Sequence, residues 1–254
     1  MKKIISIIIL SLTLVNVFAA SDSKDTLWEN AVTAYSDARY DEALDAFLTL
    51  EKDGYSSSEL YYNIGNCYFK IGTSISKSIL YYERALKLNP SYDDALFNLA
   101  LVKEQTLDKI EEVPEFIMIT QTKAIMRAFK ADTWAYISVA FFALVAVFLL
   151  AFRFSSVSFV RRTSFILSII VFVFSIIAFI FSVNLKNDVE SENFAIVTNP
   201  VAAVKSSPGE SGKTIFVLHE GTKLEIDEAL GKWTEVSIAD GKQGWIETRN
   251  FEII

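Results

Sequence analysis

The sequence contains very little cysteine, histidine or proline. Its 254 residues include one cysteine, Cys67, one histidine, His219, and four prolines. A single cysteine cannot form an intrachain disulfide, and one cysteine with one histidine cannot build a Cys/His metal cluster. A Ser/His/Asp or Cys/His catalytic set would need His219, which lies in a strand-like run far from Cys67 in the chain. We therefore predict a protein that is not an enzyme and uses no cofactor or metal.

The chain also lacks a long basic block. Its 24 Lys and Arg residues are outnumbered by 31 Asp and Glu residues, which gives a formal net charge of −7. Nucleic-acid binding relies on clustered basic side chains that neutralise phosphates, so we expect no nucleic-acid partner. The hydrophobic content of 52% is high for a soluble protein in which 22% of residues are charged.

One segment ends like a phosphate-binding loop, the run SPGESGKT at residues 207–214. Ser207 stands where the first glycine of such a loop belongs, and a strand-like run follows instead of a helix. Because a P-loop holds phosphate at a helix N-terminus, this segment is predicted to be a turn between strands.

Two long apolar runs account for much of the hydrophobic content. Residues 133–152 and 163–185 contain no charged side chain, and each has the roughly 20 residues needed to cross a bilayer. We expect transmembrane helices at 133–153 and 163–185 with a cytoplasmic loop at 154–162. A transporter or proton relay normally carries ionisable groups inside the membrane, so this hairpin is predicted to be an anchor.

Residues 1–19 are typical of a secretory signal peptide. Lys2 and Lys3 precede an apolar stretch, and Val17 and Ala19 offer small side chains at a cleavage site. An uncleaved N-terminal anchor is the alternative. In either case the next segment is exported, so the regions on both sides of the hairpin are expected on the exported side.

Residues 20–107 resemble tetratricopeptide (TPR) repeats. Ala31 and Gly65 are 34 residues apart, which is the TPR period. The second unit is the clearer one, and its pattern residues are Tyr61, Ile64, Gly65, Tyr68, Ser78, Tyr82, Ala85 and Pro90. Ser56 with Glu59 fits a capping box, and Ser91 with Asp94 approximates one. A third unit starts at Asp93 but lacks a clear second helix, so its cover is expected from the next helix or from a partner.

The first helix of each TPR repeat lines the inner groove of the array. The resemblance therefore implies a partner-binding groove formed by Trp28, Val32, Tyr35, Tyr62, Asn66, Phe69 and Phe97. These positions carry no Lys or Arg, which disfavours a ligand held by its C-terminal carboxylate. The alternative for each aromatic residue is a place in the core. The functional hypothesis is a groove for an apolar or extended protein segment.

Residues 108–132 are predicted to be a linker that contains an amphipathic helix. Lys123, Arg127 and Lys130 fall on one face, and apolar side chains fall on another. This pattern is typical of a helix in the lipid headgroup layer, with its basic residues at the phosphates. A helix packed on the repeats is the alternative.

A polar linker at 186–193 precedes a tail, residues 194–254, that reads as short strands separated by turn signals. The tail resembles a bacterial SH3 domain in Ala195-Ile196-Val197, in Gly221 before a strand, and in Asp240-Gly241 followed by Gly244-Trp245-Ile246. Trp233 and Trp245 are expected to pack in the core and turns rather than to form a ligand platform. The predicted fold is thus a multidomain α + β membrane protein with TPR helical hairpins, two transmembrane helices and a small SH3-like barrel.

The order of signal peptide, short TPR region, two close spans and SH3-like tail resembles the BatE proteins of the Bacteroides aerotolerance (Bat) operon. The resemblance implies a two-pass protein of the bacterial inner membrane with both soluble modules in the periplasm. It also implies a role in oxygen or stress tolerance and partners among von Willebrand factor A-domain membrane proteins of the operon. The leading hypothesis is a membrane-anchored protein adaptor. The alternative is a cell-wall protein whose SH3-like tail binds peptidoglycan.

Overall fold

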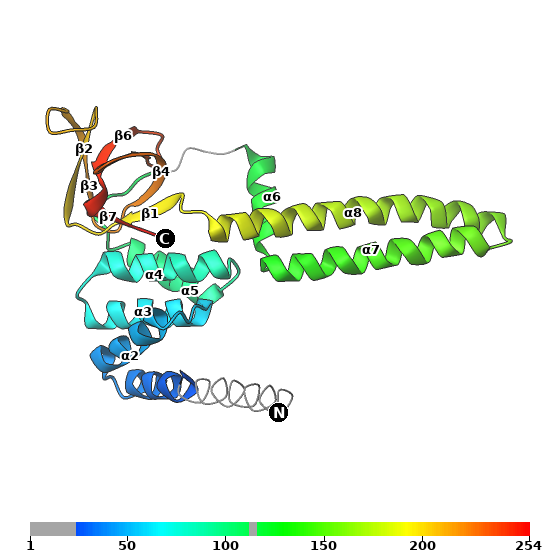
Figure 1. The fold of residues 1–254 in the computed structure, drawn as a ribbon, viewed down its shortest axis with the longest axis horizontal. Helices are drawn as coiled ribbons and strands as arrows, with labels where there is room; N and C mark the ends of the chain where they lie inside the picture. The colour runs from blue at the N-terminus through cyan, green and yellow to red at the C-terminus, as the bar shows by residue number, and fades with distance from the viewer. Residues whose placement is uncertain (1–23, 112–115) are drawn as a thin grey trace, which may run out of the picture.

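The computed structural model describes residues 24–111 and 116–254, so the predicted signal peptide lies outside the described residues. A helix over residues 24–36 opens the described chain. It is followed by four antiparallel helices that stack in a layer (Figure 1): α2 (Tyr40–Lys52), α3 (Ser58–Ile71), α4 (Ile75–Leu88) and α5 (Asp93–Lys103). Residues 104–111 are irregular, so no second helix directly follows α5, as the sequence predicts.

The close approach of α3 and α4 depends on Gly65. A Cβ atom added at Gly65 would lie 2.8 Å from two ring carbons of Tyr82 and 3.3 Å from the main-chain oxygen of Ser78. Tyr82 is fully buried and fills the space beside the glycine. The small residue and the large aromatic residue of the repeat pattern therefore act as a pair.

The helix caps differ from the predicted ones by a residue. Ser57, not Ser56, accepts a hydrogen bond from the Leu60 N–H at 3.0 Å and caps α3. The N-cap of α5 is Tyr92, and Ser91 instead donates to Asn89. Two neighbouring serines can each offer a hydroxyl, so the spacing rule alone does not select the cap.

Two long apolar helices form an antiparallel hairpin that projects from the rest of the molecule (Figure 1): α7 (Ala131–Phe154) and α8 (Ser158–Glu190). Both are long and apolar enough to cross a membrane. The helix α8 begins at Ser158, inside the segment expected to be a loop, so only residues 155–157 separate the two helices.

Serine residues hold the two helices of the hairpin close together. The Ser138 hydroxyl donates to the Ser175 main-chain oxygen at 3.0 Å, and the Ser175 hydroxyl donates to the Ser138 main-chain oxygen at 3.0 Å. Ser164, Ser168 and Ala178 are also buried between the helices. These small side chains allow close packing, while large apolar side chains cover the outside of the hairpin.

The tail folds into one antiparallel sheet with the strand order β3-β2-β6-β5-β4-β1-β7. Its strands are β1 (Phe194–Val197), β2 (Val201–Lys205), β3 (Thr214–His219), β4 (Lys223–Leu230), β5 (Trp233–Ser237), β6 (Gln243–Glu247) and β7 (Phe251–Ile253). The sheet encloses a small core centred on Val204, Leu224, Val236 and Ile246. Residues 206–213 connect β2 to β3, so the segment that resembles a phosphate-binding loop is a turn between strands, as predicted.

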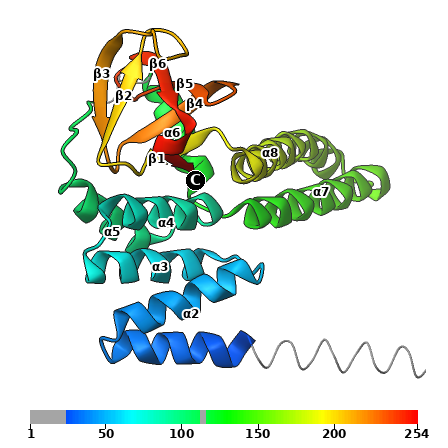
Figure 2. The same cartoon turned by 60° about the vertical axis from the view of Figure 1, so that its left-hand side comes forward.

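The sheet packs directly on α4, which joins it to the repeat helices (Figure 2). Ile196 of β1 belongs to the same buried cluster as Ile79 and Leu80 of α4 and Val102 of α5. The sheet therefore provides apolar cover where the third repeat, which α5 begins, has no second helix.

Asp108 holds the irregular segment after α5 against the sheet. Its carboxylate accepts hydrogen bonds from the His219 N–H and the Thr222 hydroxyl, each at 2.7 Å, and contacts Nδ1 of His219 at 2.8 Å. Burial alone would raise the pKa of Asp108, but these hydrogen bonds lower it below its ordinary value. Ile110 packs against the core of the sheet.

Candidate functional site

The face predicted to bind a partner is built from the helix over residues 24–36, from α3 and from α5. We call the seven predicted residues the repeat face: Trp28, Val32, Tyr35, Tyr62, Asn66, Phe69 and Phe97. Val32 and Phe97 are exposed, with relative accessibilities of 40% and 71%, and Asn66 is buried. The other four are half-buried.

The half-buried aromatic residues of the repeat face also contact the cores. Trp28 makes edge contacts with Phe47 and Tyr55, and Tyr35 makes one with Tyr40. Phe69 packs against the cluster shared with the sheet. These residues therefore stabilise the repeats while part of each side chain stays accessible.

A hydrogen-bonded network includes Tyr62 and Asn66 of the repeat face. The Asn66 Oδ1 atom accepts from the Tyr82 hydroxyl at 2.7 Å and from the Asn98 amide at 2.9 Å. Asn98 also donates to the Tyr62 hydroxyl at 3.3 Å, and the Tyr62 ring lies 5.0 Å from that of Tyr92. The network links α3, α4 and α5, so it fixes the orientation of side chains across the face.

Asn98 and Tyr92 belong to this surface although the repeat pattern did not predict them. Asn98 is the one polar residue in the apolar run from Ala95 to Val102. Its isolation in that run is the signal that marks it, because a polar side chain among apolar neighbours needs a hydrogen-bond partner. Tyr92 carries no comparable signal in the sequence.

The predicted membrane-surface residues lie on or beside α6 (Ile117–Arg127). Lys123, Arg127 and Lys130 are all exposed, and α6 has no buried residue. The helix runs across the axis of the hairpin near the end where α7 begins and α8 ends (Figure 1). Trp134 of α7 donates from Nε1 to the Met126 main-chain oxygen at 2.8 Å, which ties α6 to the hairpin.

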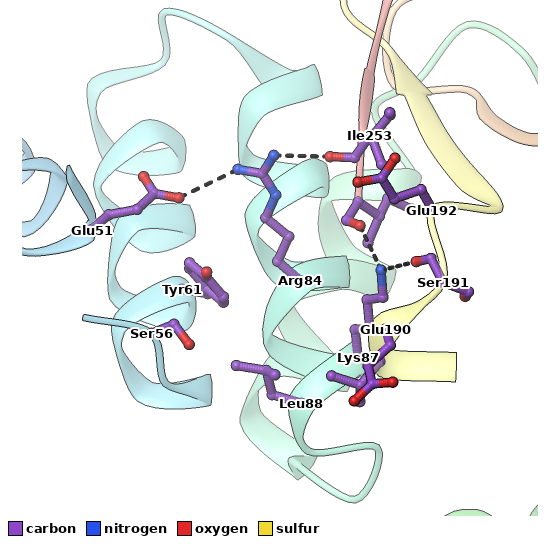
Figure 3. Close-up of a pocket in the computed structure, with 12 residues that line it drawn as sticks. Glu51, Ser56, Tyr61, Arg84, Lys87, Leu88, Glu190, Ser191, Glu192 and Ile253 are labelled. Carbon is purple, nitrogen blue, oxygen red and sulfur yellow. Dashed lines mark hydrogen bonds and ion pairs between the residues drawn. The ribbon is translucent and has the colours of Figure 1, made fainter. Parts of the chain in front are cut away.

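A pocket of about 510 Å³ lies elsewhere, where the repeats meet α8 and the end of the sheet (Figure 3). Its charged lining residues are Glu51, Arg84, Lys87, Glu190 and Glu192. Arg84 donates to the Ile253 main-chain oxygen at 2.8 Å, and Lys87 donates to the main-chain oxygens of Ser191 and Ile254 at 2.5 Å and 2.7 Å. Sequence patterns gave no sign of this pocket, since its parts are more than 100 residues apart.

The outer face of the sheet carries two tryptophans. Thr234, Val236 and Ile246 face the core, so alternation along β5 and β6 turns Trp233 and Trp245 outward, where both are half-buried. They therefore lie outside the core of the sheet, contrary to the core part of the expectation of core and turn packing. The Lys205 ammonium lies 4.7 Å from the centre of the Trp233 ring.

The residues that could carry chemistry are held in structural positions. Cys67 is fully buried, and burial raises the pKa of its thiol to about 12, which disfavours the reactive thiolate. His219 is bound to Asp108. Within residues 24–111 and 116–254, no group of three or more His, Cys, Asp or Glu side chains is placed to hold a metal ion.

No protein-family model matches the chain. Part of it is similar to proteins named photosystem I assembly protein Ycf3. The similarity is 36% identity over 78 residues in Cyanophora paradoxa, covering 30% of this chain and 44% of the relative. It is 33% over 88 residues in Rippkaea orientalis, covering 34% and 50%, and 31% over 98 residues in Acaryochloris marina, covering 37% and 58%.

The chain thus spans about half the length of the relatives it matches. These matches support a TPR-type helical repeat. The relatives are named as assembly proteins.

Proposed function

We propose that this protein is a membrane-anchored adaptor whose repeat face binds an extended, largely apolar segment of a protein partner. The observation that carries the proposal is the exposure of Val32 and Phe97 beside the fixed network of Tyr62, Asn66 and Asn98. An ordered surface with apolar anchors and polar groups loses little side-chain entropy when a partner binds.

The hairpin is the proposed membrane anchor, and α6 is the proposed surface helix. Phe116, Ile117 and Met118 are each at least 66% exposed, and Lys123 and Arg127 lie on the same short helix. A helix that crosses the hairpin axis would lie along the surface of a membrane that the hairpin spans. This arrangement supports contact of the apolar side chains with lipid and of the basic side chains with phosphates.

The compartment and the partners of this adaptor rest on the resemblance to BatE proteins. It favours the bacterial inner membrane, with the TPR region at 20–107 and the SH3-like barrel at 194–254 on the periplasmic side. The proposed partners are von Willebrand factor A-domain membrane proteins in an aerotolerance or stress-related complex. The name of the photosystem I assembly relatives supports the general role of an assembly adaptor.

Site-specific crosslinking tests the repeat face. A photoreactive phenylalanine analogue placed at Phe97 in the full-length protein should crosslink a protein partner in native membranes. The same analogue at Leu230, an exposed residue of the sheet, serves as the matched control. Val32→Glu should abolish the Phe97 crosslink, because a charge would be brought against the apolar partner segment. Equal crosslinking with and without Val32→Glu would remove the repeat face from the proposal.

Peptidoglycan binding by the sheet is the second candidate function. The outward-facing Trp233 and Trp245 favour it, since flat aromatic side chains with a nearby Lys205 suit carbohydrate stacking. Full-length protein in detergent should sediment with purified sacculi, and Trp233→Ala with Trp245→Ala should prevent this. Leu230→Ala is the control, and a double variant that sediments as well as the unchanged protein would exclude the platform.

A further inference from the structure

The pocket beside α8 combines charges of both signs with an apolar wall. Arg84 and Lys87 supply the positive charges on α4, and Glu190 and Glu192 supply exposed negative charges at the end of α8 (Figure 3). Leu88 and Val189 are the apolar neighbours of these charged groups. A ligand that fits this lining carries an anion and a cation close together and continues into an apolar part.

Lys87 is the cation with donor capacity to spare. Its ammonium group has three hydrogens, and two donate to the main-chain oxygens of Ser191 and Ile254. Among the residues that the structure describes, the third hydrogen is available to an anionic oxygen in the pocket. Burial lowers the pKa of Lys87, and the negative charge of Glu192, which lines the same pocket, partly opposes this shift.

The position of the pocket along α8 indicates that such a ligand comes from the membrane. The apolar run of α8 ends at Leu185, and the pocket is lined by residues 189–192. At about 1.5 Å per residue, these residues begin about 6 Å beyond the apolar run. The headgroup layer extends about 5 to 8 Å beyond the hydrocarbon core on each side. The pocket therefore stands at headgroup height if the hairpin spans the membrane.

We infer that this pocket binds the headgroup of a phospholipid with a primary amine, phosphatidylethanolamine. Lys87, with Arg84 beside it, holds the phosphate, and Glu190 and Glu192 accept hydrogen bonds from the ammonium group. Leu88 and Val189 lie against the glycerol and the start of the acyl chains. A bound lipid would set the height of the repeats above the membrane, which deepens the proposed anchoring and depends on it.

Native mass spectrometry of the full-length protein in lipid-free detergent provides the test. We expect phosphatidylethanolamine to bind about tenfold more tightly than phosphatidylcholine with the same acyl chains. The quaternary ammonium of phosphatidylcholine cannot donate hydrogen bonds, whereas the primary ammonium of phosphatidylethanolamine can. Glu190→Gln with Glu192→Gln should reduce this preference to about onefold, because both carboxylates that accept from the ammonium group are lost, whereas Lys87→Met should weaken the binding of both lipids. Glu192→Gln alone, on an exposed segment, should reduce it in part without affecting folding. Lys70→Met, an exposed lysine of α3 outside the pocket, should leave it unchanged.

Three results would overturn the inference. Equal binding of the two lipids would exclude recognition of the amine, and an unchanged preference in the variant that lacks both Glu190 and Glu192 carboxylates would place the lipid elsewhere. Binding of water-soluble glycerophosphoethanolamine as tight as that of the lipid would exclude the membrane as the source. The Phe97 crosslink should persist in the same variants, because it depends on the repeat face and not on the pocket. A negative result for lipid binding would therefore leave the proposed partner binding untouched.

Discussion

Glu83 of α4 lies between Lys103 of α5 and Lys223 of β4. Its carboxylate accepts from the two lysines at 2.8 Å and 2.7 Å. Burial alone would raise the pKa of Glu83, but Lys223 and Lys103 lower it to about 2. One buried charge is thus neutralised by a lysine from each soluble module, so Glu83 contributes to the contact between them.

Replacing Glu83 should weaken this contact in a pH-dependent way. Glu83→Gln leaves two lysines without their carboxylate, and we expect a loss of about 2 kcal/mol at pH 7, or about 5 °C in the unfolding midpoint. Because the folded pKa lies below the ordinary value of 4.5, the stabilisation is complete above pH 4.5 and is lost as the pH falls toward 2.

Differential scanning fluorimetry of the full-length protein in detergent measures both effects of Glu83→Gln. The exposed Glu29→Gln is the matched control. Equal midpoints for the two variants at pH 7 would show that Glu83 does not join the modules. The difference between Glu83→Gln and the unchanged protein should shrink between pH 4.5 and pH 2.

At the level of elements, the hairpin depends on small residues at the seam between its helices. Ser138→Leu removes a reciprocal pair of hydrogen bonds. It also places a larger side chain at a buried position, since Ser138 is only 8% exposed. Interhelical hydrogen bonds in membranes contribute about 0.6 kcal/mol on average, and overpacking costs about 1 to 3 kcal/mol. Steric crowding should therefore dominate, and α7 and α8 should move apart near this position.

Disulfide crosslinking detects that separation. The rings of Phe141 on α7 and Phe174 on α8 have centres 6.2 Å apart. Cysteines introduced at both positions in a Cys67→Ala background should oxidise readily, and Ser138→Leu should slow the reaction. Ser156→Leu, an equal change in the exposed connection between the helices, should have no effect. An unchanged oxidation rate in the Ser138→Leu protein would contradict the claim that Ser138 is needed for close packing of α7 and α8.

The elements were largely predictable from the sequence, because their signals are local. Apolar length alone marks α7 and α8, and the spacing of Gly65, Ser78 and Tyr82 marks the α3–α4 pair. The alternation along β5 also predicts that Trp233 faces outward. We expected Trp233 in the core because large apolar residues are usually buried. The alternation, not the residue type, decides which side of a small sheet a side chain takes.

For the whole molecule, the docking of the sheet on the repeats was not predictable. It joins Ile196 to Ile79 and Lys223 to Glu83, pairs more than 100 residues apart that share no local pattern. The pocket beside α8 also combines residues of the repeats, of α8 and of the sheet. The repeat face was predictable in part, because its positions follow the 34-residue period, whereas Asn98 depends on packing between α3 and α5.

The docking of the sheet on the repeats also constrains the topology of the protein in a membrane. Arg84 of the repeats donates to Ile253 of the sheet, so both modules must lie on one side of any bilayer that the hairpin spans. In a Cys67→Ala background, single cysteines at the exposed Glu29 and Ser211 should react with an impermeant maleimide from the periplasm. A cysteine at Ser156 should react only after the inner membrane is opened. Labelling of position 156 from the periplasm would refute the spanning hairpin, and opposite sides for positions 29 and 211 would refute the docking.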